Sequence, residues 1–97
     1  MSKHRKSLIS NIKQCHFCGT TVRLHRHHVF NGNPGRILSE LYGCWVWLCV
    51  MHHIGKWGVH LNQPLDEELK RDCQLALMER ENWTLQEFRG VFGKSYV

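Results

Sequence analysis

The chain has 97 residues, 42% of them apolar, which allows one domain and leaves no room for two. Lys and Arg number 13 against 8 Asp and Glu, so the formal charge is +5, and only 2 prolines argue against general disorder. So short a chain has a small core, which often needs a disulfide or a metal as a staple. With 5 Cys and 8 His, the composition favours a metal.

Two classes of protein are excluded by the apolar pattern. No secretory signal is visible near residue 1, and the longest apolar stretch, residues 41–51, is shorter than the ~20 residues of a membrane span. We therefore expect no membrane partner and a cytoplasmic, reducing location, where disulfides are disfavoured. The cysteines, an odd number, are then metal ligands or core residues.

The chain begins with a basic arm, residues 1–14, that contains no acid. This arm is either a solvated terminus or a segment that contacts phosphate. Residues 15–97 follow as one domain, with its functional motifs in residues 15–60 and a helical cover in residues 61–97.

Strands and one short helix are expected in the motif region. Residues 21–30 predict a strand around a polar histidine cluster. Residues 37–42 predict a helix that Gly43 ends, because glycine takes the left-handed conformation readily. Residues 45–48 predict a strand that is apolar on both faces. We expect the two strands to pair as an antiparallel β-hairpin.

In residues 61–97, the helical cover, we expect two helices on one side of the sheet. The first should begin at Pro64, with Asp66 as its cap and an apolar stripe at helical spacing. The second should begin at a capping box formed by Thr84 and Glu87.

Two ligand pairs have the spacing of a structural zinc site. Cys15 and Cys18 form the first pair, and Cys49 and His52 form the second, thirty residues further on. Each pair can close half of a tetrahedron from one turn, so together they tie distant parts of a short chain. The alternative is a buried Cys49 and an incidental pair of cysteines at 15 and 18.

The other histidines exceed what one structural zinc can use. His27 and His28 are neighbours on a predicted strand and face opposite ways, so one can bind a second metal while the other activates water. His53 and His60 lie downstream and remain for the same open site. The alternative for His27 and His28 is a polar strand with exposed histidines. His25 has no evident role.

From Cys15 to His60 the chain resembles the zinc-stapled HNH endonucleases, the ββα-metal group, and is most similar to their small bacteriophage members. The resemblance implies a small α+β fold: a ββα-metal element with a structural zinc, flanked by C-terminal helices. The motifs that carry it are Cys15-x2-Cys18-Gly19, Leu24-x2-His27-His28-Val29-Phe30 and Leu48-Cys49-x2-His52-His53.

The resemblance also implies an activity, metal-dependent hydrolysis of phosphodiester bonds that nicks or cuts DNA. His28 would be the general base that takes a proton from water. His27 and His53 would hold a catalytic Mg²⁺, Mn²⁺, Ni²⁺ or Zn²⁺ ion, with His60 as a third ligand or a phosphate contact.

One position departs from the family pattern. Cys44 stands where the family's middle Asn usually orients the general base. A backbone carbonyl, Asn31 or Asn33 could orient His28 instead. Cys44 and Cys73 do not fit the zinc spacing and are expected in the core.

Charge predicts a nucleic-acid face. All acids except Glu40 fall within residues 66–87, whereas cations surround the metal motifs. This favours binding to double-stranded DNA, although the positive charge could simply aid solubility. A second function class is a catalytically weak or inactive zinc-stapled module that binds nucleic acid or protein, such as a subunit of a phage complex. The oligomeric state stays open, and a homodimer is one alternative. The side chains expected to contact DNA are Arg23, Arg26, Arg36 and Lys56.

Overall fold

The computed structural model describes residues 6–10, 12–55, 58–59 and 62–97. The elements are β1 (Leu24–His28), α1 (Gly35–Tyr42), β2 (Trp45–Cys49), α2 (Val50–His53), α3 (Gln63–Glu81) and α4 (Leu85–Phe92). The two strands form an antiparallel sheet, which together with the helices confirms the small α+β class. No helix in the described part of the chain is long and apolar enough to cross a membrane.

The strands pair as expected, and the predicted helix lies in the connection between them. The connection contains α1, which packs on β1 and ends at Gly43 in the left-handed conformation, as predicted. The strand was expected over residues 21–30, but residues 21–23 and 29–30 lie outside it. The reason is the register, because Leu24 pairs with Cys49, where β2 ends, and His28 pairs with Trp45, where β2 begins.

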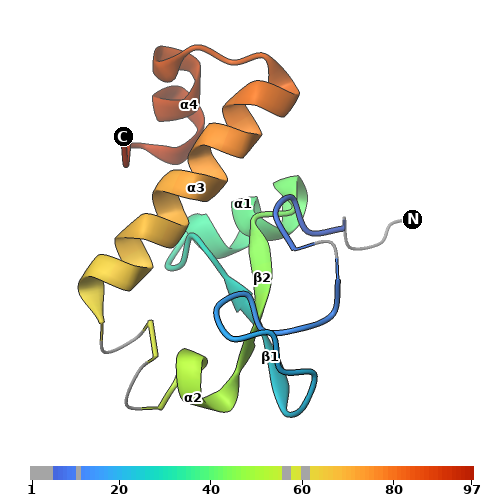
Figure 1. Cartoon of the computed structure of the whole chain (residues 1–97). Helices are drawn as coiled ribbons and strands as arrows, with labels where there is room; N and C mark the ends of the chain where they lie inside the picture. Colours follow the sequence, from blue (N-terminus) through green and yellow to red (C-terminus); the bar gives the residue numbers. More distant parts are fainter. Residues whose placement is uncertain (1–5, 11, 56–57, 60–61) are drawn as a thin grey trace.

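The N-terminal segment runs beside the outer edge of β2. The His16 amide donates to the carbonyl oxygen of Trp47 at 2.8 Å, and the buried Ser7 hydroxyl donates to that of Trp45. Leu8 packs against the core. The described residues of the basic arm from Ser7 onward are therefore part of the folded domain, beside β2 (Figure 1).

The long helix α3 supplies much of the core. Its cap is Asn62, whose side chain accepts a hydrogen bond from the Leu65 amide at 3.2 Å. The predicted cap, Asp66, instead lies in the first turn, because the helix begins one residue before Pro64. The buried residues of α3 lie on the predicted stripe, with one polar addition, and are Leu69, Cys73, Gln74 and Leu77.

The second C-terminal helix, α4, begins at the predicted capping box. The Thr84 amide donates to the Glu87 carboxylate at 2.8 Å, and the Glu87 amide donates to the Thr84 hydroxyl at 3.1 Å. Phe88 and Phe92 of this helix pack on Phe30, with ring centroids 5.9 and 4.7 Å away. Because Phe30 lies just beyond β1, this aromatic cluster joins the helices to the strand that carries the histidines.

Candidate metal centre and histidine cluster

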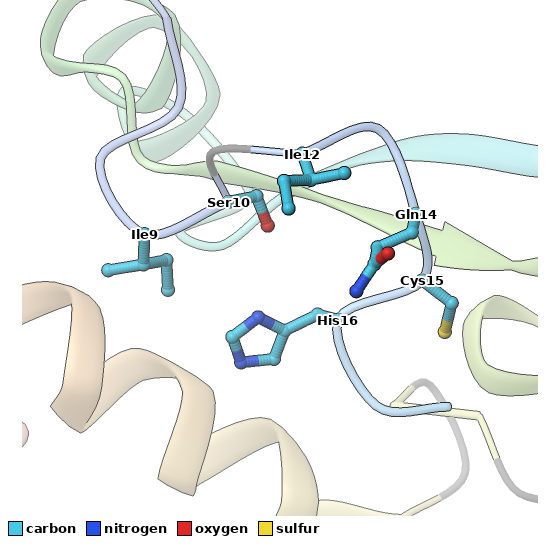
Figure 2. A pocket seen from close by; sticks show the side chains of 6 residues that line it. All are labelled: Ile9, Ser10, Ile12, Gln14, Cys15 and His16. Carbon is cyan, nitrogen blue, oxygen red and sulfur yellow. The ribbon is translucent and has the colours of Figure 1, made fainter. Parts of the chain in front are cut away.

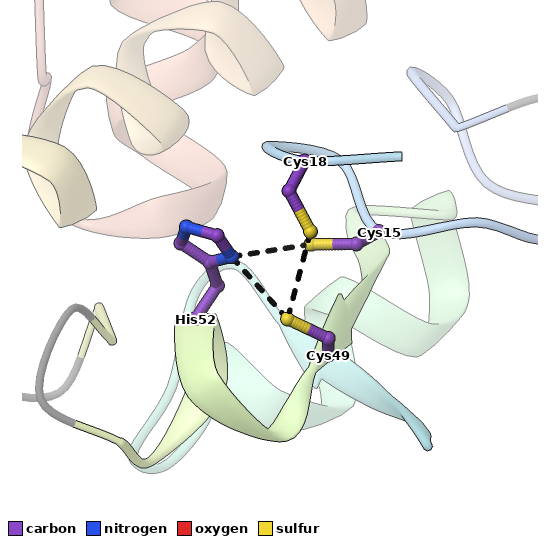
Figure 3. A group of neighbouring side chains, drawn as sticks. All are labelled: Cys15, Cys18, Cys49 and His52. Atoms are coloured by element: carbon purple, nitrogen blue, oxygen red, sulfur yellow. Dashed lines mark hydrogen bonds between the residues drawn. The ribbon is translucent and has the colours of Figure 1, made fainter. Parts of the chain in front are cut away.

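The two predicted ligand pairs come together at one end of the sheet. Cys15 and Cys18 lie in the N-terminal loop, Cys49 is the last residue of β2, and His52 lies in α2 (Figure 3). Their ligand atoms all lie within 4.8 Å of one another. Within the described ranges, this is the one group of three or more metal-ligating side chains so close together.

The distances within this cluster match a tetrahedral site. Zinc bonds of about 2.3 Å to sulfur and 2.0–2.1 Å to nitrogen place two sulfurs about 3.8 Å apart, and a sulfur and a nitrogen about 3.5 Å apart. The Sγ atoms of Cys18 and Cys49 are 3.8 Å apart. Nδ1 of His52 lies 3.6 Å from Sγ of Cys15 and 3.3 Å from Sγ of Cys49. The four residues can therefore hold one metal ion, and their donor set suits zinc.

Local structure fixes both halves of this cluster. The first half is a tight turn in which the Gly19 amide donates to the Cys15 carbonyl at 2.9 Å, with Gly19 at a φ of 79°. Such a φ favours glycine, because a Cβ would crowd the backbone. In the second half, one helical turn brings His52 back to Cys49.

Hydrogen bonds prepare one thiol of the cluster to bind a cation. Burial raises the pKa of the Cys15 thiol, but donation from backbone amides, that of Cys49 foremost, outweighs it and brings the pKa to about 6. The Thr20 amide lowers the pKa of Cys18, yet burial and the neighbouring thiols raise it above the ordinary value overall. Metal ligation requires the thiolate, so Cys15 is already in its binding form at neutral pH.

A second cluster lies beside the first and consists of histidines on one face of β1. His27 is only 3% exposed, and its ring centroid lies 5.2 Å from that of His53 in α2. Nδ1 of His25 lies 2.9 Å from Nδ1 of His53. Sequence reasoning assigned no role to His25. Strand alternation was the available signal, since residues 25 and 27 share a face.

An open depression of about 310 Å³ brings several predicted site residues together. The base candidate His28 borders it together with both metal-ligand candidates, His27 and His53. Arg36, an exposed cation, stands at the same depression. His60 and Lys56, the other two predicted residues of this region, lie outside the described residues. Among the described residues, the lining is Arg26, His27, His28, Asn31, Gly32, Arg36 and His53.

The other face of β1 carries an ion-pair network that sequence reasoning missed. Nε2 of His28 lies 2.5 Å from Oε2 of Glu40, and Nη2 of Arg26 lies 3.0 Å from Oε1 of the same carboxylate. The Arg26 guanidinium also lies over the Trp45 ring, 3.9 Å from its centroid. Arg26 therefore has an intramolecular role, and its contact with DNA stays a prediction, as does that of the exposed Arg23.

Cys44, which stands at the position of the family's middle Asn, lies in the core with Cys73, as predicted. A hydrogen bond between the two thiols, together with burial, raises the pKa of Cys73, so that it stays protonated. Cys44 therefore does not face His28. Of the two asparagines considered in its place, Asn31 lines the depression and Asn33 is exposed.

A second depression, of about 230 Å³, lies on the N-terminal segment. Figure 2 shows Ser10, Gln14 and His16 around this hollow, with Ile9 beside them. Its polar lining is one imidazole, one amide, one hydroxyl and the thiol of Cys15, which already belongs to the four-residue cluster, so the described lining contains no base with an orienting acid. Hydrolytic chemistry is therefore better served by the depression beside β1.

Comparison with protein-family models, curated proteins and solved structures gives no match to this chain. The chemistry of its two clusters must therefore be argued from their own geometry.

Proposed function

We propose that this chain is a metal-dependent DNA endonuclease of the HNH type, in which β1, β2 and α2 form the ββα-metal element. The observation that carries the proposal is the depression beside β1. It combines a base candidate, His28, with two imidazoles that suit a metal, those of His27 and His53, and with a phosphate-binding cation, Arg36.

In this proposal the two metal centres have different tasks. The cluster of Cys15, Cys18, Cys49 and His52 holds a structural zinc, because all four positions of a tetrahedron are taken by protein ligands. His27 and His53 hold the second ion. When bound, that ion supplies Lewis-acid stabilisation of charge on the phosphate. Imidazole donors favour Mn²⁺, Ni²⁺ or Zn²⁺ over Mg²⁺, which prefers oxygen ligands.

His28 performs the proton transfer. Its imidazole takes a proton from water while the water oxygen forms a bond to phosphorus and the bond from phosphorus to the 3′ oxygen breaks. The departing 3′ oxygen collects a proton from solvent. A neutral imidazole is suited to this task near neutral pH, and removal of such a base costs on the order of 10²–10⁴ in rate.

Arg36 provides the anchor for substrate at the same depression. It is exposed, and a guanidinium binds phosphate through paired hydrogen bonds. Contacts of this kind give affinity for the DNA backbone without sequence preference.

A supercoiled-plasmid assay tests the proposal. Zinc-loaded protein is incubated with Mg²⁺, Mn²⁺ or Ni²⁺ in turn, and His28→Ala is the variant. We expect relaxed or linear product from the wild type and a loss of on the order of 10²–10⁴ in rate from the variant. Zinc content and thermal unfolding show that the variant is folded.

Two outcomes would contradict the proposal. Cleavage at the wild-type rate by His28→Ala removes His28 as the base. Intact plasmid with every metal, from folded and zinc-bound wild type, favours the zinc-stapled binding module instead. DNA binding measured by fluorescence anisotropy then separates a nucleic-acid partner from a protein partner.

A further inference from the structure

We propose that Glu40 is the positioning residue of the base: it fixes His28 in the tautomer whose Nδ1 accepts the proton from water. This rests on the proposed function for its chemical meaning, although the tautomer itself can be measured without cleavage. Glu40 is the only acid in the first 65 residues of the chain. It lies in α1, and its carboxylate meets His28 across the sheet edge at 2.5 Å.

The backbone around Glu40 is held firmly. Its neighbour Ser39 is fully buried, and its hydroxyl accepts from the Phe30 amide at 3.0 Å and donates to the Phe30 carbonyl at 2.7 Å. The carbonyl of Ser39 accepts from the Cys44 amide at 2.7 Å. These bonds tie α1 to the residues just beyond β1 and just before β2. The distance between Glu40 and His28 is therefore set by the fold rather than by a flexible loop.

The contact selects one tautomer of the imidazole. A neutral imidazole carries one N–H and one lone pair, and a carboxylate can only accept a hydrogen bond. Nε2 of His28 must therefore carry the hydrogen, which it donates to Glu40, and Nδ1 carries the lone pair. With Nδ1 as the basic nitrogen, the ring can take a proton from water without first exchanging tautomers.

Arg26 makes this carboxylate compatible with a DNA-binding surface. An unpaired carboxylate next to His28 would repel phosphate. Arg26 donates to its second oxygen at 3.0 Å and is itself placed over Trp45. The side chains of Arg26 and Glu40 are 27% and 28% exposed, so the pair is partly shielded from solvent. The ion pair neutralises the charge and keeps Oε2 directed at His28.

The variant Glu40→Gln distinguishes tautomer control from simple packing. The amide must offer its oxygen to the fixed donor Arg26, which turns its NH₂ group toward His28. An NH₂ group only donates, so it demands a lone pair at Nε2 and moves the hydrogen to Nδ1. The isosteric variant should thus be at least as harmful as Glu40→Ala, although it preserves the shape of the side chain.

The experiment measures tautomer and cleavage separately. Nitrogen-15 NMR of the imidazoles, with zinc at one equivalent and at a pH of about 8, where histidine is neutral, reports which nitrogen of His28 carries hydrogen. We expect hydrogen on Nε2 in the wild type and on Nδ1 in Glu40→Gln. The cleavage rate of a DNA duplex at saturating protein should fall roughly 10- to 100-fold in Glu40→Gln and in Glu40→Ala, with DNA affinity no weaker than that of the wild type.

Glu81→Gln is the matched control. Glu81 pairs with Arg80 at 2.9 Å, and its side chain is 29% exposed, close to the value for Glu40, but it lies at the end of α3. This control should leave the tautomer and the cleavage rate unchanged. Hydrogen on Nε2 of His28 together with a wild-type rate in Glu40→Gln would overturn the inference while the nuclease proposal stands. The expected tautomer exchange in a wild type that cleaves no DNA would sustain the positioning role and reject the nuclease.

Discussion

Two regions of the molecule differ in what holds them together. The sheet region consists of β1, β2, α2 and the N-terminal loop. Its loop, β2 and α2 come together at a group of thiols and one imidazole. The helical region, α3 and α4, is held by the apolar core that it shares with the strands, to which it contributes Leu69, Leu77 and Phe88. Every candidate site residue of the described chain lies in or beside the sheet region. Loss of the metal should therefore remove both stability and function, whereas damage to the helical core should cost stability alone.

Removal of a structural ligand should have the largest effect. Cys49→Ala leaves the cluster with three donors and should abolish stable zinc binding, which contributes about 10–16 kcal/mol in small zinc domains. We expect the sheet region to unfold, as it should on treatment with a chelator. Elemental analysis and circular dichroism during heating measure both effects.

Cys73→Ala is the control for that experiment, because it removes a buried thiol outside the cluster. It should keep one equivalent of zinc and lose about 0.5–3 kcal/mol of unfolding free energy. If Cys49→Ala kept its zinc and its melting temperature, the contrast between the two regions would be wrong.

Truncation in the helical core should come next. Phe88 is fully buried and stacks on Phe92, with ring centroids 4.5 Å apart. Phe88→Ala should lower the free energy of unfolding by about 3–5 kcal/mol, through lost burial and a cavity. Zinc should remain bound. Leu85→Ala, at a position 43% exposed on the same helix, should change stability by about 0.5 kcal/mol or less. Urea denaturation with zinc analysis of each variant would expose any dependence of the metal on this core.

A smaller change tests how the chain beyond α2 supports His53. A Cβ at Gly58 would lie 2.7 Å from the carbonyl carbon and oxygen of His53, which are backbone atoms and cannot move aside cheaply. Gly58→Ala should cost about 1–3 kcal/mol and displace His53. Gly90→Ala, where a Cβ meets nothing within 4 Å, should instead stabilise α4 by up to about 1 kcal/mol. Equal melting temperatures for the two variants would contradict this expectation.

The most local expected effect concerns His25 and is confined to the second site. Its Nδ1 contact with His53 should orient that ring, and loss of such an outer partner lowers metal affinity roughly 10- to 100-fold. Calorimetric titration of the zinc-loaded His25→Ala variant with Mn²⁺ or Ni²⁺ measures this change. His16→Ala removes a histidine at the other depression and should leave the affinity unaltered. An unaltered affinity in His25→Ala would limit the second site to the residues expected from sequence.

The features that sequence reasoning predicted correctly are local in the chain. The knuckle spacing of Cys15 and Cys18, the capping box of Thr84 and Glu87, and the stop at Gly43 all depend on residues within one turn of each other. The expectation that Asp66 caps α3 was wrong for an equally local reason. Asn62, four residues earlier, is also a good capping residue, and it is the one that caps the helix. Spacing also predicted that the two ligand pairs would meet, because one shared metal would account for both pairs, and the structure brings them together.

Apart from the meeting of the two ligand pairs, contacts between distant segments could not be predicted from spacing. Gln74 illustrates this: it is fully buried on α3, where its amide nitrogen donates to the Ser95 hydroxyl at 3.0 Å and its oxygen accepts from the Tyr96 amide at 2.7 Å. A glutamine on a helix is ordinarily a surface residue, so nothing in its neighbourhood in sequence signals burial. The thiol contact of Cys44 with Cys73 is equally long in range.

The sequence by itself determined the two ligand pairs of the structural cluster, the end of α1 at Gly43, the start of α4 at its capping box and the alternation that turns His27 and His28 to opposite faces. Each of these depends on the repeat of a helix, a strand or a turn. Only the tertiary structure decided which group meets each histidine: His25 for His53, and Glu40 for His28. These pairings arise where α1 and α2 pack against β1. That packing depends on the whole core, and no local repeat in the sequence encodes it.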